Sequence, residues 1–338
     1  MFSLITQLLH YLPSEFSHHL ALKSLKGLHS LKLLSLLMQR NESTSNQLHG
    51  LKLDDKFKKS FRSRLGIAAG LDKNGDYIDC LAELGVGFIE VGTVTPRPQY
   101  GNPKPRIFRN KNEKSILNRL GFNNKGVEYL VKKLEERNSS IPIGVSIGKN
   151  SDTPNEEAFR DYLYCMQKVY QFSDYIAVNI SSPNTSDLRE LSEAEHLDDL
   201  LKALKEEQNK LTFSYGYVPI FLKISPDENQ NNLEKICKSI LENNIDGIIC
   251  TNTTNNHTNT NGPGGISGAP LRNKSTKILI EVQKILGDSK LIIASGGVMS
   301  SNDFQQKLDS GANLVQIYSG FIYEGPKLVR DILEFEAY

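Results

Sequence analysis

The chain has 338 residues, a length that suits a barrel of alternating strands and helices and that can bury a full core without disulfides or structural metal. Its 40 basic and 39 acidic residues give a formal charge of +1, so no overall field favours nucleic acid as a partner. The four cysteines show no C-x-x-C spacing, which indicates buried thiols in a reducing compartment and argues against a metal site.

The first forty residues predict two short helices separated by Pro13. Their leucine-rich stripes, with lysines interspersed in the second, comprise Leu4, Ile5, Leu8, Leu9 and Leu12, then Leu20, Leu25, Leu28 and Leu31 with Lys23, Lys26 and Lys32. Such helices either lie in a membrane interface or cap the bottom of a barrel. No signal peptide, Arg-rich presequence or spanning apolar stretch is recognisable here. Residues 41–63, which include the polar run Asn41–Asn46, are predicted to be a linker and a barrel-bottom segment.

Eight short apolar runs then recur along residues 64–338, many ending in glycine or a polar residue. They are Arg64–Gly70, Phe88–Thr93, Pro142–Gly148, Tyr175–Ser181, Pro219–Ser225, Gly247–Thr253, Leu291–Gly297 and Leu314–Ser319. Helical stripes separate several of them, for example Phe159, Tyr162, Leu163 and Met166. The pattern predicts an α/β fold, a (β/α)₈ TIM barrel. A doubly wound open sheet is the alternative, but no G-x-G-x-x-G follows the first strand.

Two connections, Val94–Gly126 and Thr254–Pro270, are unusually long and are expected to be functional loops at the carboxyl ends of strands. The same ends carry Gly296-Gly297 and Tyr318-Ser319-Gly320, a glycine-rich pattern typical of a barrel phosphate site. Lysines near strand ends are either ion-paired or directed at an anionic ligand; these are Lys73 and Lys223. Asparagines at the same mouth suit a small planar ring with carbonyls and N–H groups, although each alone fits a turn; they are Asn118, Asn179, Asn184 and Asn252.

The chain resembles the dihydroorotate dehydrogenases over nearly its whole length. The motifs that carry the resemblance are AAGLDKNG (68–75), GTVTPRPQ (92–99), NRLGFNN (118–124), NISSPNT (179–185), TNTT (251–254), SGGV (295–298) and LVQIYSG (314–320). Serine at position 182 and an N-terminal helical extension are similar to the membrane-associated, quinone-reducing class. The soluble class has a cysteine base and lacks the extension.

The resemblance implies one non-covalent FMN per chain, and it implies a role for each matching position. Flavin contacts fall on Ala69, Gly70, Leu71, Asp72, Lys73, Thr93, Ser146, Asn179, Lys223, Thr251, Gly268, Gly297, Tyr318 and Ser319. Orotate contacts fall on Lys73, Asn118, Arg119, Leu120, Gly121, Phe122, Asn179, Asn184, Asn252 and Thr253. The implied catalytic residues are Ser182 as base, Thr185 as its relay, and Lys73. A quinone tunnel beneath the helices of residues 1–40 would be bordered by His18, Arg109 and Tyr318.

The implied function is oxidation of dihydroorotate to orotate in pyrimidine synthesis, with electrons passed to a membrane quinone. The expected partners are dihydroorotate, quinone and a phospholipid surface, without nucleic acid or a required protein partner. The expected place is the cytoplasmic face of the inner membrane. Two alternatives stay open: another FMN-dependent barrel oxidoreductase, such as a hydroxy-acid oxidase with a histidine base, or a non-enzymatic scaffold on a membrane surface.

Two departures from the family pattern stand out. Ser146 occupies a position where the family usually has a flavin-contacting asparagine, and a serine cannot supply the donor and acceptor pair of an amide. Phe61-Arg62-Ser63-Arg64 replaces a usual Asn-Pro before the first strand, at the expected barrel bottom, where an effect on folding is expected and none on catalysis.

Overall fold

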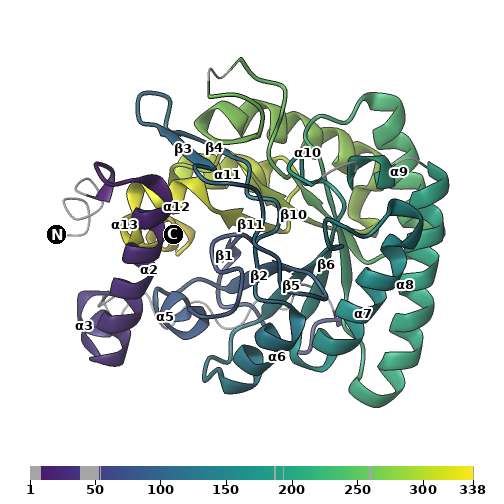
Figure 1. The fold of residues 1–338 in the computed structure, drawn as a ribbon, viewed down its shortest axis with the longest axis horizontal. Coiled ribbons are helices and arrows are strands. Elements are labelled where there is room, and N and C mark those ends of the chain that lie inside the picture. The colour runs from purple at the N-terminus through teal and green to yellow at the C-terminus, as the bar shows by residue number, and fades with distance from the viewer. Residues whose placement is uncertain are drawn as a thin grey trace.

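The computed structural model describes residues 9–38, 53, 55–185, 188–192, 194–258 and 261–337. Eight parallel strands close a barrel in the order β1-β11-β10-β8-β7-β6-β5-β2 (Figure 1). Their bounds are β1 Leu65–Ile67, β2 Phe88–Val94, β5 Ile143–Ile147, β6 Tyr175–Asn179, β7 Ile220–Ile224, β8 Gly247–Cys250, β10 Leu291–Ser295 and β11 Leu314–Ile317. Each coincides with one of the predicted runs, so the predicted (β/α)₈ barrel is confirmed.

Helices surround the barrel (Figure 1). They are α5 Ile78–Glu83, α6 Val127–Glu136, α7 Ala158–Val169, α8 Ala194–Tyr215, α9 Gln230–Glu242, α10 Arg272–Leu286, α11 Ser301–Asp309, α12 Ser319–Glu324 and α13 Pro326–Glu336. Short 3₁₀ helices occupy Asn155–Glu157, Tyr170–Phe172, Leu188–Ser192, Ala269–Leu271 and Gly287–Ser289. Almost every barrel-strand residue is buried, because the helices cover the outer face and side chains fill the inner one.

Aromatic rings fill the bottom of the barrel. Phe57 and Phe61, from the segment before β1, pack edge-on with ring centroids 4.9 Å apart and reach Phe221 and Phe88 of the barrel. The rings of this layer that belong to barrel strands each face a glycine on the neighbouring strand, as Phe88 faces Gly66 in register. A Cβ on Gly66 would lie 2.4 Å from the Phe88 ring, so the alternation of large and absent side chains fixes this layer.

A small antiparallel sheet lies over the barrel mouth, where the sequence predicted only loops. Its order is β3-β4-β9, with β3 Ile107–Asn110, β4 Ser115–Asn118 and β9 Gly265–Gly268. The β3–β4 hairpin comes from the connection after β2, and β9 comes from the connection after β8. The two long connections therefore support each other across the mouth through backbone hydrogen bonds.

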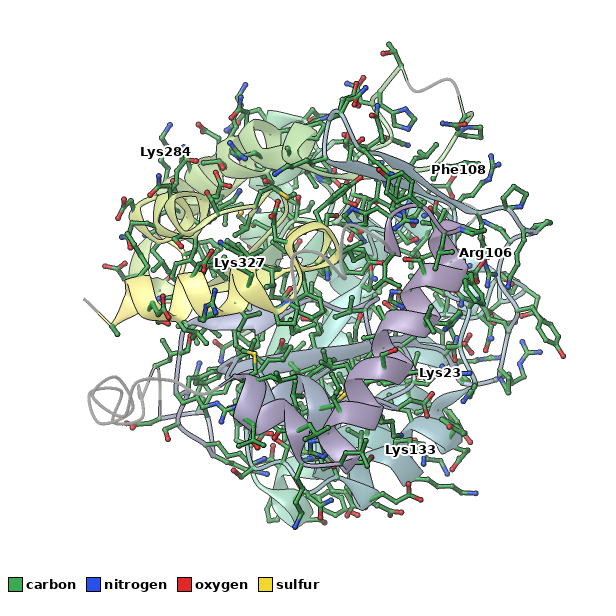
Figure 2. The ribbon with its side chains drawn as sticks, turned by 90° about the vertical axis from the view of Figure 1, so that its left-hand side faces the viewer. Lys23, Arg106, Phe108, Lys133, Lys284 and Lys327 are labelled. Atoms are coloured by element: carbon green, nitrogen blue, oxygen red, sulfur yellow. The ribbon has the colours of Figure 1, made fainter. Side chains whose placement is uncertain are left out.

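The N-terminal region contributes α2 Ser14–Ser30 and α3 Leu33–Leu37. Figure 2 views the molecule from the side on which α2 lies, and both views place it beside α13. Besides α3, it contacts α5 and β3, and the aromatic rings of Phe57 and Phe61 fill the barrel bottom instead. Of the two alternatives for these helices, the cap at the barrel bottom is therefore wrong for residues 14–38. Most of the first predicted helix and the polar run Asn41–Asn46 lie outside the described residues.

Candidate functional site

A cavity of about 940 Å³, called the polar cavity below because many polar side chains line it, opens at the carboxyl ends of the barrel strands. Every barrel strand except β5 contributes to its wall, either through its last residues or through the turn that follows it. The small sheet above supplies Asn118, Ser267 and Gly268. This is the face on which barrel enzymes assemble their active sites.

An ion pair forms part of the cavity floor. The ammonium of Lys223 lies 3.1 Å from a carboxylate oxygen of Glu90, and both side chains are almost fully buried. Glu90 also accepts hydrogen bonds from the hydroxyl of Tyr175 (3.0 Å) and the amide of Gln316 (2.7 Å). Lys223 is thus ion-paired, which is the first of the two sequence-based alternatives, and it also lines the cavity.

Lys73 is the second cation of the cavity and sits on the turn after β1. Its ammonium donates a 2.8 Å hydrogen bond to the carbonyl of Gly70. Burial, with a smaller contribution from Arg106, lowers the pKa of Lys73 to about 8. A cation with a single neutral acceptor retains two donors that an anionic ligand can use.

Side-chain amides are linked to one another along the wall opposite. Asn184 donates to Asn118 at 3.0 Å, and Asn252 donates to Asn179 at 3.2 Å. Asn179 in turn donates to Thr93 at 2.8 Å. Asn252 also donates to the Oγ of Ser181 at 3.1 Å, and Asn118 donates to the carbonyl of Gly265 at 3.1 Å. Most of these amides are therefore held in place by bonds to neighbouring protein groups.

Ser182 is buried and lines the same cavity as these amides. The backbone N–H of Asn184 donates to its Oγ at 3.3 Å. Within the described residues, the Oγ1 of Thr185 and the Oδ1 of Asn184 are buried without a hydrogen-bond partner. Buried polar atoms are nearly always paired in native proteins, so these atoms indicate a place for water or ligand beside Ser182.

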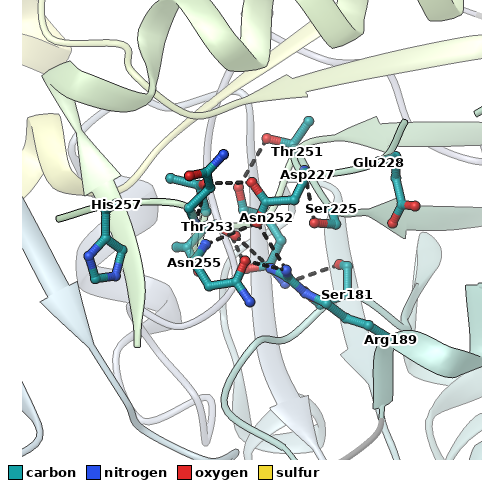
Figure 3. Close-up of polar contacts among 12 residues, drawn as sticks. Ser181, Arg189, Ser225, Asp227, Glu228, Thr251, Asn252, Thr253, Asn255 and His257 are labelled. Atoms are coloured by element: carbon teal, nitrogen blue, oxygen red, sulfur yellow. Dashed lines mark hydrogen bonds and ion pairs between the residues drawn. The ribbon is translucent and has the colours of Figure 1, made fainter. Parts of the chain in front are cut away.

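Arg189 ties together the turns after β6, β7 and β8, of which the first and the last carry site residues (Figure 3). Its guanidinium donates to the carbonyl of Ser181 (3.3 Å), the carbonyl of Thr253 (3.0 Å) and a carboxylate oxygen of Asp227 (2.9 Å). Asp227, on the turn after β7, also pairs with Lys274. Burial alone would raise the pKa of Asp227, but hydrogen bonds from Lys274, Thr254, Asn255 and Arg189 lower it below the ordinary value. We call this group the Arg189 clamp.

A second, apolar pocket of about 1390 Å³ lies between α2 and the barrel. Aliphatic side chains dominate its wall, including Leu22, Leu25, Ile107 and Ile116. Arg109 closes one side, donating to the hydroxyls of Ser14 and Ser17, both at 3.2 Å. His18 also lines this pocket, and burial, followed by the nearby charge of Lys73, lowers the pKa of its imidazole to about 3.

Tyr318 lines both cavities and therefore forms part of the wall between them. Burial raises the pKa of its phenol to about 12, so the ring stays neutral at ordinary pH. Its ring lies 3.3 Å from the position that a Cβ on Gly70 would occupy. Since φ of Gly70 is +99°, glycine suits this close approach both conformationally and sterically.

The N-terminal helices expose apolar side chains that usually are buried. Tyr11, Phe16, Leu31 and Leu36 are between 57% and 81% exposed. The lysines at positions 23, 26 and 32 are exposed on the same two helices. Among the described residues, no helix has the length and apolarity required to cross a membrane. Nor do those residues gather three or more His, Cys, Asp or Glu side chains in a metal-binding group.

Most of the sequence-predicted site residues meet in the two cavities. The polar cavity is lined by Ala69, Gly70, Lys73, Thr93, Asn118, Leu120, Gly121, Phe122, Asn179, Ser182, Asn184, Lys223, Thr251, Asn252, Thr253, Gly268, Gly297, Tyr318 and Ser319. The apolar pocket is lined by His18, Arg109 and Tyr318, and also by Leu71, which was predicted to contact the flavin.

Four other predicted residues do not line either cavity. Asp72 is buried behind the first turn, where it accepts bonds from the N–H groups of Asp76 and Tyr77. Ser146 reaches the cavity only through Thr93, whose hydroxyl lies 2.8 Å away. The side chain of Arg119 turns outward, with its guanidinium over the ring of Phe108. Thr185 is buried and lines neither cavity.

Several lining residues were not singled out from the sequence. They are Ser267, Leu271, Ser295, Val298, Met299 and Gln316. All three of Ser295, Val298 and Gln316 lie inside quoted motifs, so attention to the residues on either side of each glycine turn finds them. Glu90 and the Arg189 clamp were also missed, because no local pattern marks a residue that acts by pairing with a distant one.

Comparisons with known proteins agree on one family. The family model described as dihydroorotate dehydrogenase matches residues 53–335. A relative from Shewanella sediminis, named dihydroorotate dehydrogenase (quinone), is 48% identical over 327 residues, covering 95% of this chain and 94% of its own. One of the same name from Vibrio parahaemolyticus is 46% identical over 330 residues, covering 96% of each. The crystal structure of DHODH from Eimeria tenella in complex with ferulenol is similar with a TM-score of 0.85 at 31% identity, covering 99% of this chain and 94% of that chain.

Proposed function

Because the chain belongs to the dihydroorotate dehydrogenase family, we propose that it oxidises (S)-dihydroorotate to orotate, with FMN as the first electron acceptor and a membrane quinone as the last. This is the redox step of de novo pyrimidine synthesis. The observation that carries the proposal is one cavity that joins Lys73, Ser182 and linked asparagine amides with a glycine-lined end. Its neighbour is an apolar pocket that shares Tyr318.

The residues of the polar cavity fit FMN. Gly70 lets a flat ring approach the backbone beside Tyr318, and Lys223 places a cation in the floor. Gly268, Gly297 and Ser319 line the end where backbone N–H groups would hold the phosphate. When bound, FMN supplies the acceptor for the hydride that leaves C6 of dihydroorotate.

The chain's own residues would hold the substrate and move the proton. Lys73 would pair with the substrate carboxylate, and the amides of Asn118, Asn184 and Asn252 would bind the ring carbonyls and N–H groups. Ser182 would take the proton from C5 as the C5=C6 double bond forms. Thr185, whose hydroxyl has no partner in the described residues, would pass that proton on through water.

The apolar pocket would receive the quinone. Its wall of leucine and isoleucine side chains suits a prenyl tail, and Arg109 offers a donor to a quinone carbonyl. His18 is neutral over the ordinary pH range because burial depresses the pKa of its imidazole, so it can accept or donate a hydrogen bond there without a charge.

The exposed apolar side chains and lysines of α2 and α3 would place this pocket at a bilayer. Such helices lie in the headgroup region with their apolar side chains inserted, and lysines favour an anionic leaflet. A quinone could then enter without crossing water. We propose that the protein is a peripheral membrane protein on the cytoplasmic face of the inner membrane. It would require neither nucleic acid nor a protein partner.

The test is to purify the full chain and measure orotate formation with a quinone analogue, with fumarate and with NAD in parallel. A yellow protein that forms orotate fastest with the quinone analogue supports the proposal. Preference for fumarate or NAD would reject the quinone assignment. A folded chain that takes up no flavin would reject the proposal as a whole.

A further inference from the structure

Lys307 of α11 is among the largest fully buried side chains, with none of its surface exposed. Its ammonium donates to the hydroxyls of Ser275 (2.7 Å) and Thr276 (2.8 Å) on α10, and both of these partners are neutral. Asp303, on the same helix, pairs with Arg272 at 2.9 Å. A buried cation with neutral partners is costly unless a counter-charge lies nearby, which directs attention to what lies beyond Ser275.

Beyond Ser275 lies the glycine turn of the polar cavity. The hydroxyl of Ser275 lies 2.9 Å from the carbonyl oxygen of Gly296, and the Nε of Arg272 lies 3.3 Å from that of Gly297. A Cβ on Gly297 would lie only 2.2 Å from the Cα of Arg272, so α10 and the turn are in direct backbone contact. Two successive carbonyls of the turn are therefore held from behind by α10.

Because α10 holds the carbonyls of Gly296 and Gly297, it also sets the direction of the N–H groups in the same two peptide units. In a trans peptide the N–H points away from the C=O, so the N–H groups of Gly297 and Val298 point away from α10. Gly296, Gly297 and Val298 all line the cavity, which places these two donors on the cavity side. Successive N–H groups directed into one cavity form an anion-binding arrangement.

Lys307 determines the direction in which the hydroxyl of Ser275 donates its proton. Because the ammonium donates to the Oγ of Ser275, that hydroxyl must direct its own proton elsewhere, and the nearest acceptor is the Gly296 carbonyl. The second acceptor, the carbonyl of Arg272 at 3.1 Å, is already bonded to the hydroxyl of Thr276 at 2.8 Å.

We propose that Lys307 is a positioning residue for the phosphate of FMN: it fixes the glycine turn through Ser275 and supplies a positive charge behind it. The residue does not touch the ligand. This inference rests on the proposed function, since it takes FMN as the occupant of the cavity.

The experiment compares FMN with riboflavin, which has the same ring system and no phosphate. Full-length protein is freed of flavin and titrated with each by fluorescence. Lys307→Met should weaken FMN binding by about tenfold to a hundredfold, the size expected for one lost charge interaction at an effective dielectric of about 20. Riboflavin binding should change by less than about twofold. The matched control is Lys284→Met on the exposed face of α10, where the lysine is 64% exposed and both ligands should bind as in the wild type.

The unfolding temperature of the flavin-free variants separates positioning from packing. Lys307→Met fills a similar volume without a buried charge, so it should unfold at or above the wild-type temperature. Ser275→Ala removes only the intermediate hydroxyl and should weaken FMN selectively as well. Equal losses of FMN and riboflavin, or unchanged FMN binding in both variants, would overturn the inference. A wild-type chain that binds neither flavin would instead refute the proposed function.

Discussion

Ser182 is a weak base at neutral pH, so its neighbours decide whether it can accept a proton. It lies buried at the cavity wall, it receives only a 3.3 Å bond from the N–H of Asn184, and the hydroxyl of Thr185 close by in the chain has no partner among the described residues. This environment leaves its oxygen available on the cavity side.

Replacing Ser182 with alanine should therefore impair one step only. Ser182→Ala should keep FMN and orotate bound while slowing flavin reduction by dihydroorotate ~10²–10⁴-fold in stopped-flow absorbance. Ser182→Cys should retain part of the rate with a shifted pH profile, because a thiol ionises more readily. Reduction of Ser182→Ala at the wild-type rate would place the base elsewhere.

Lys73 gives the site a pH dependence. Burial lowers the pKa of Lys73 to about 8 in the ligand-free protein, so the side chain is charged below that pH and neutral above it. The dissociation constant for orotate should stay flat below pH 8 and rise by about tenfold per pH unit above it. Lys73→Met should bind orotate weakly at every pH and lose the bend. A wild-type titration by flavin absorbance that stays flat to pH 9 would contradict the assignment.

Residue positions were predictable from the sequence wherever a side chain follows the end of a barrel strand. Lys73, Asn179 and Asn252 line the cavity for that reason. The sequence could not show where longer or bonded side chains point. The Arg119 side chain points out to the Phe108 ring, and the hydroxyl of Ser146 is bonded to that of Thr93, because in each case the partner lies on another strand.

At the scale of elements, the Arg189 clamp joins the turns after β6, β7 and β8 (Figure 3). These turns carry Ser182 and Thr253, so the clamp fixes how the base faces the substrate. The bonds to the carbonyls of Ser181 and Thr253 come from different nitrogens of the planar guanidinium, and a lysine ammonium cannot reproduce this geometry.

Arg189→Lys should consequently slow reduction by dihydroorotate by about tenfold or more while leaving FMN bound and reoxidation by quinone at the wild-type rate. Arg160→Lys is the matched control, because Arg160 is 67% exposed and pairs with Glu157 on the surface. Rapid-mixing measurements of the two half-reactions make the comparison. Equal slowing of both half-reactions would indicate general loosening of the fold.

The eight barrel strands were predictable because each is an apolar run buried on both faces. The sheet β3-β4-β9 was not, because its strands are four residues long and lie in segments rich in proline, asparagine and glycine. Its pairing joins Asn118 with Gly265, which are far apart in the sequence. No local periodicity reports such a pairing, and only the closed barrel brings the two connections together.

At the scale of the whole molecule, the N-terminal helices and the barrel chemistry should be separable. A chain that begins near Asn41 keeps the aromatic plug of Phe57 and Phe61 and every residue that lines the polar cavity. It should bind FMN, be reduced by dihydroorotate and pass electrons to a small soluble dye. It should lose vesicle binding and most turnover with a long-tailed quinone, since α2 forms one wall of the apolar pocket. Full-rate turnover with that quinone would refute the tunnel.

The position of Tyr318 between two cavities has a kinetic consequence. Because Tyr318 lines both cavities while Lys73 lines only the polar one, a molecule in the apolar pocket leaves the place beside Lys73 vacant. Dihydroorotate and a ligand of the apolar pocket can therefore be bound to the same protein molecule at the same time. A tight ligand of the apolar pocket should then act competitively toward quinone and uncompetitively toward dihydroorotate, because it leaves the reduction of the flavin by dihydroorotate unchanged. The protein would have two adjoining binding sites, and quinone could enter the apolar pocket before orotate has left the polar cavity.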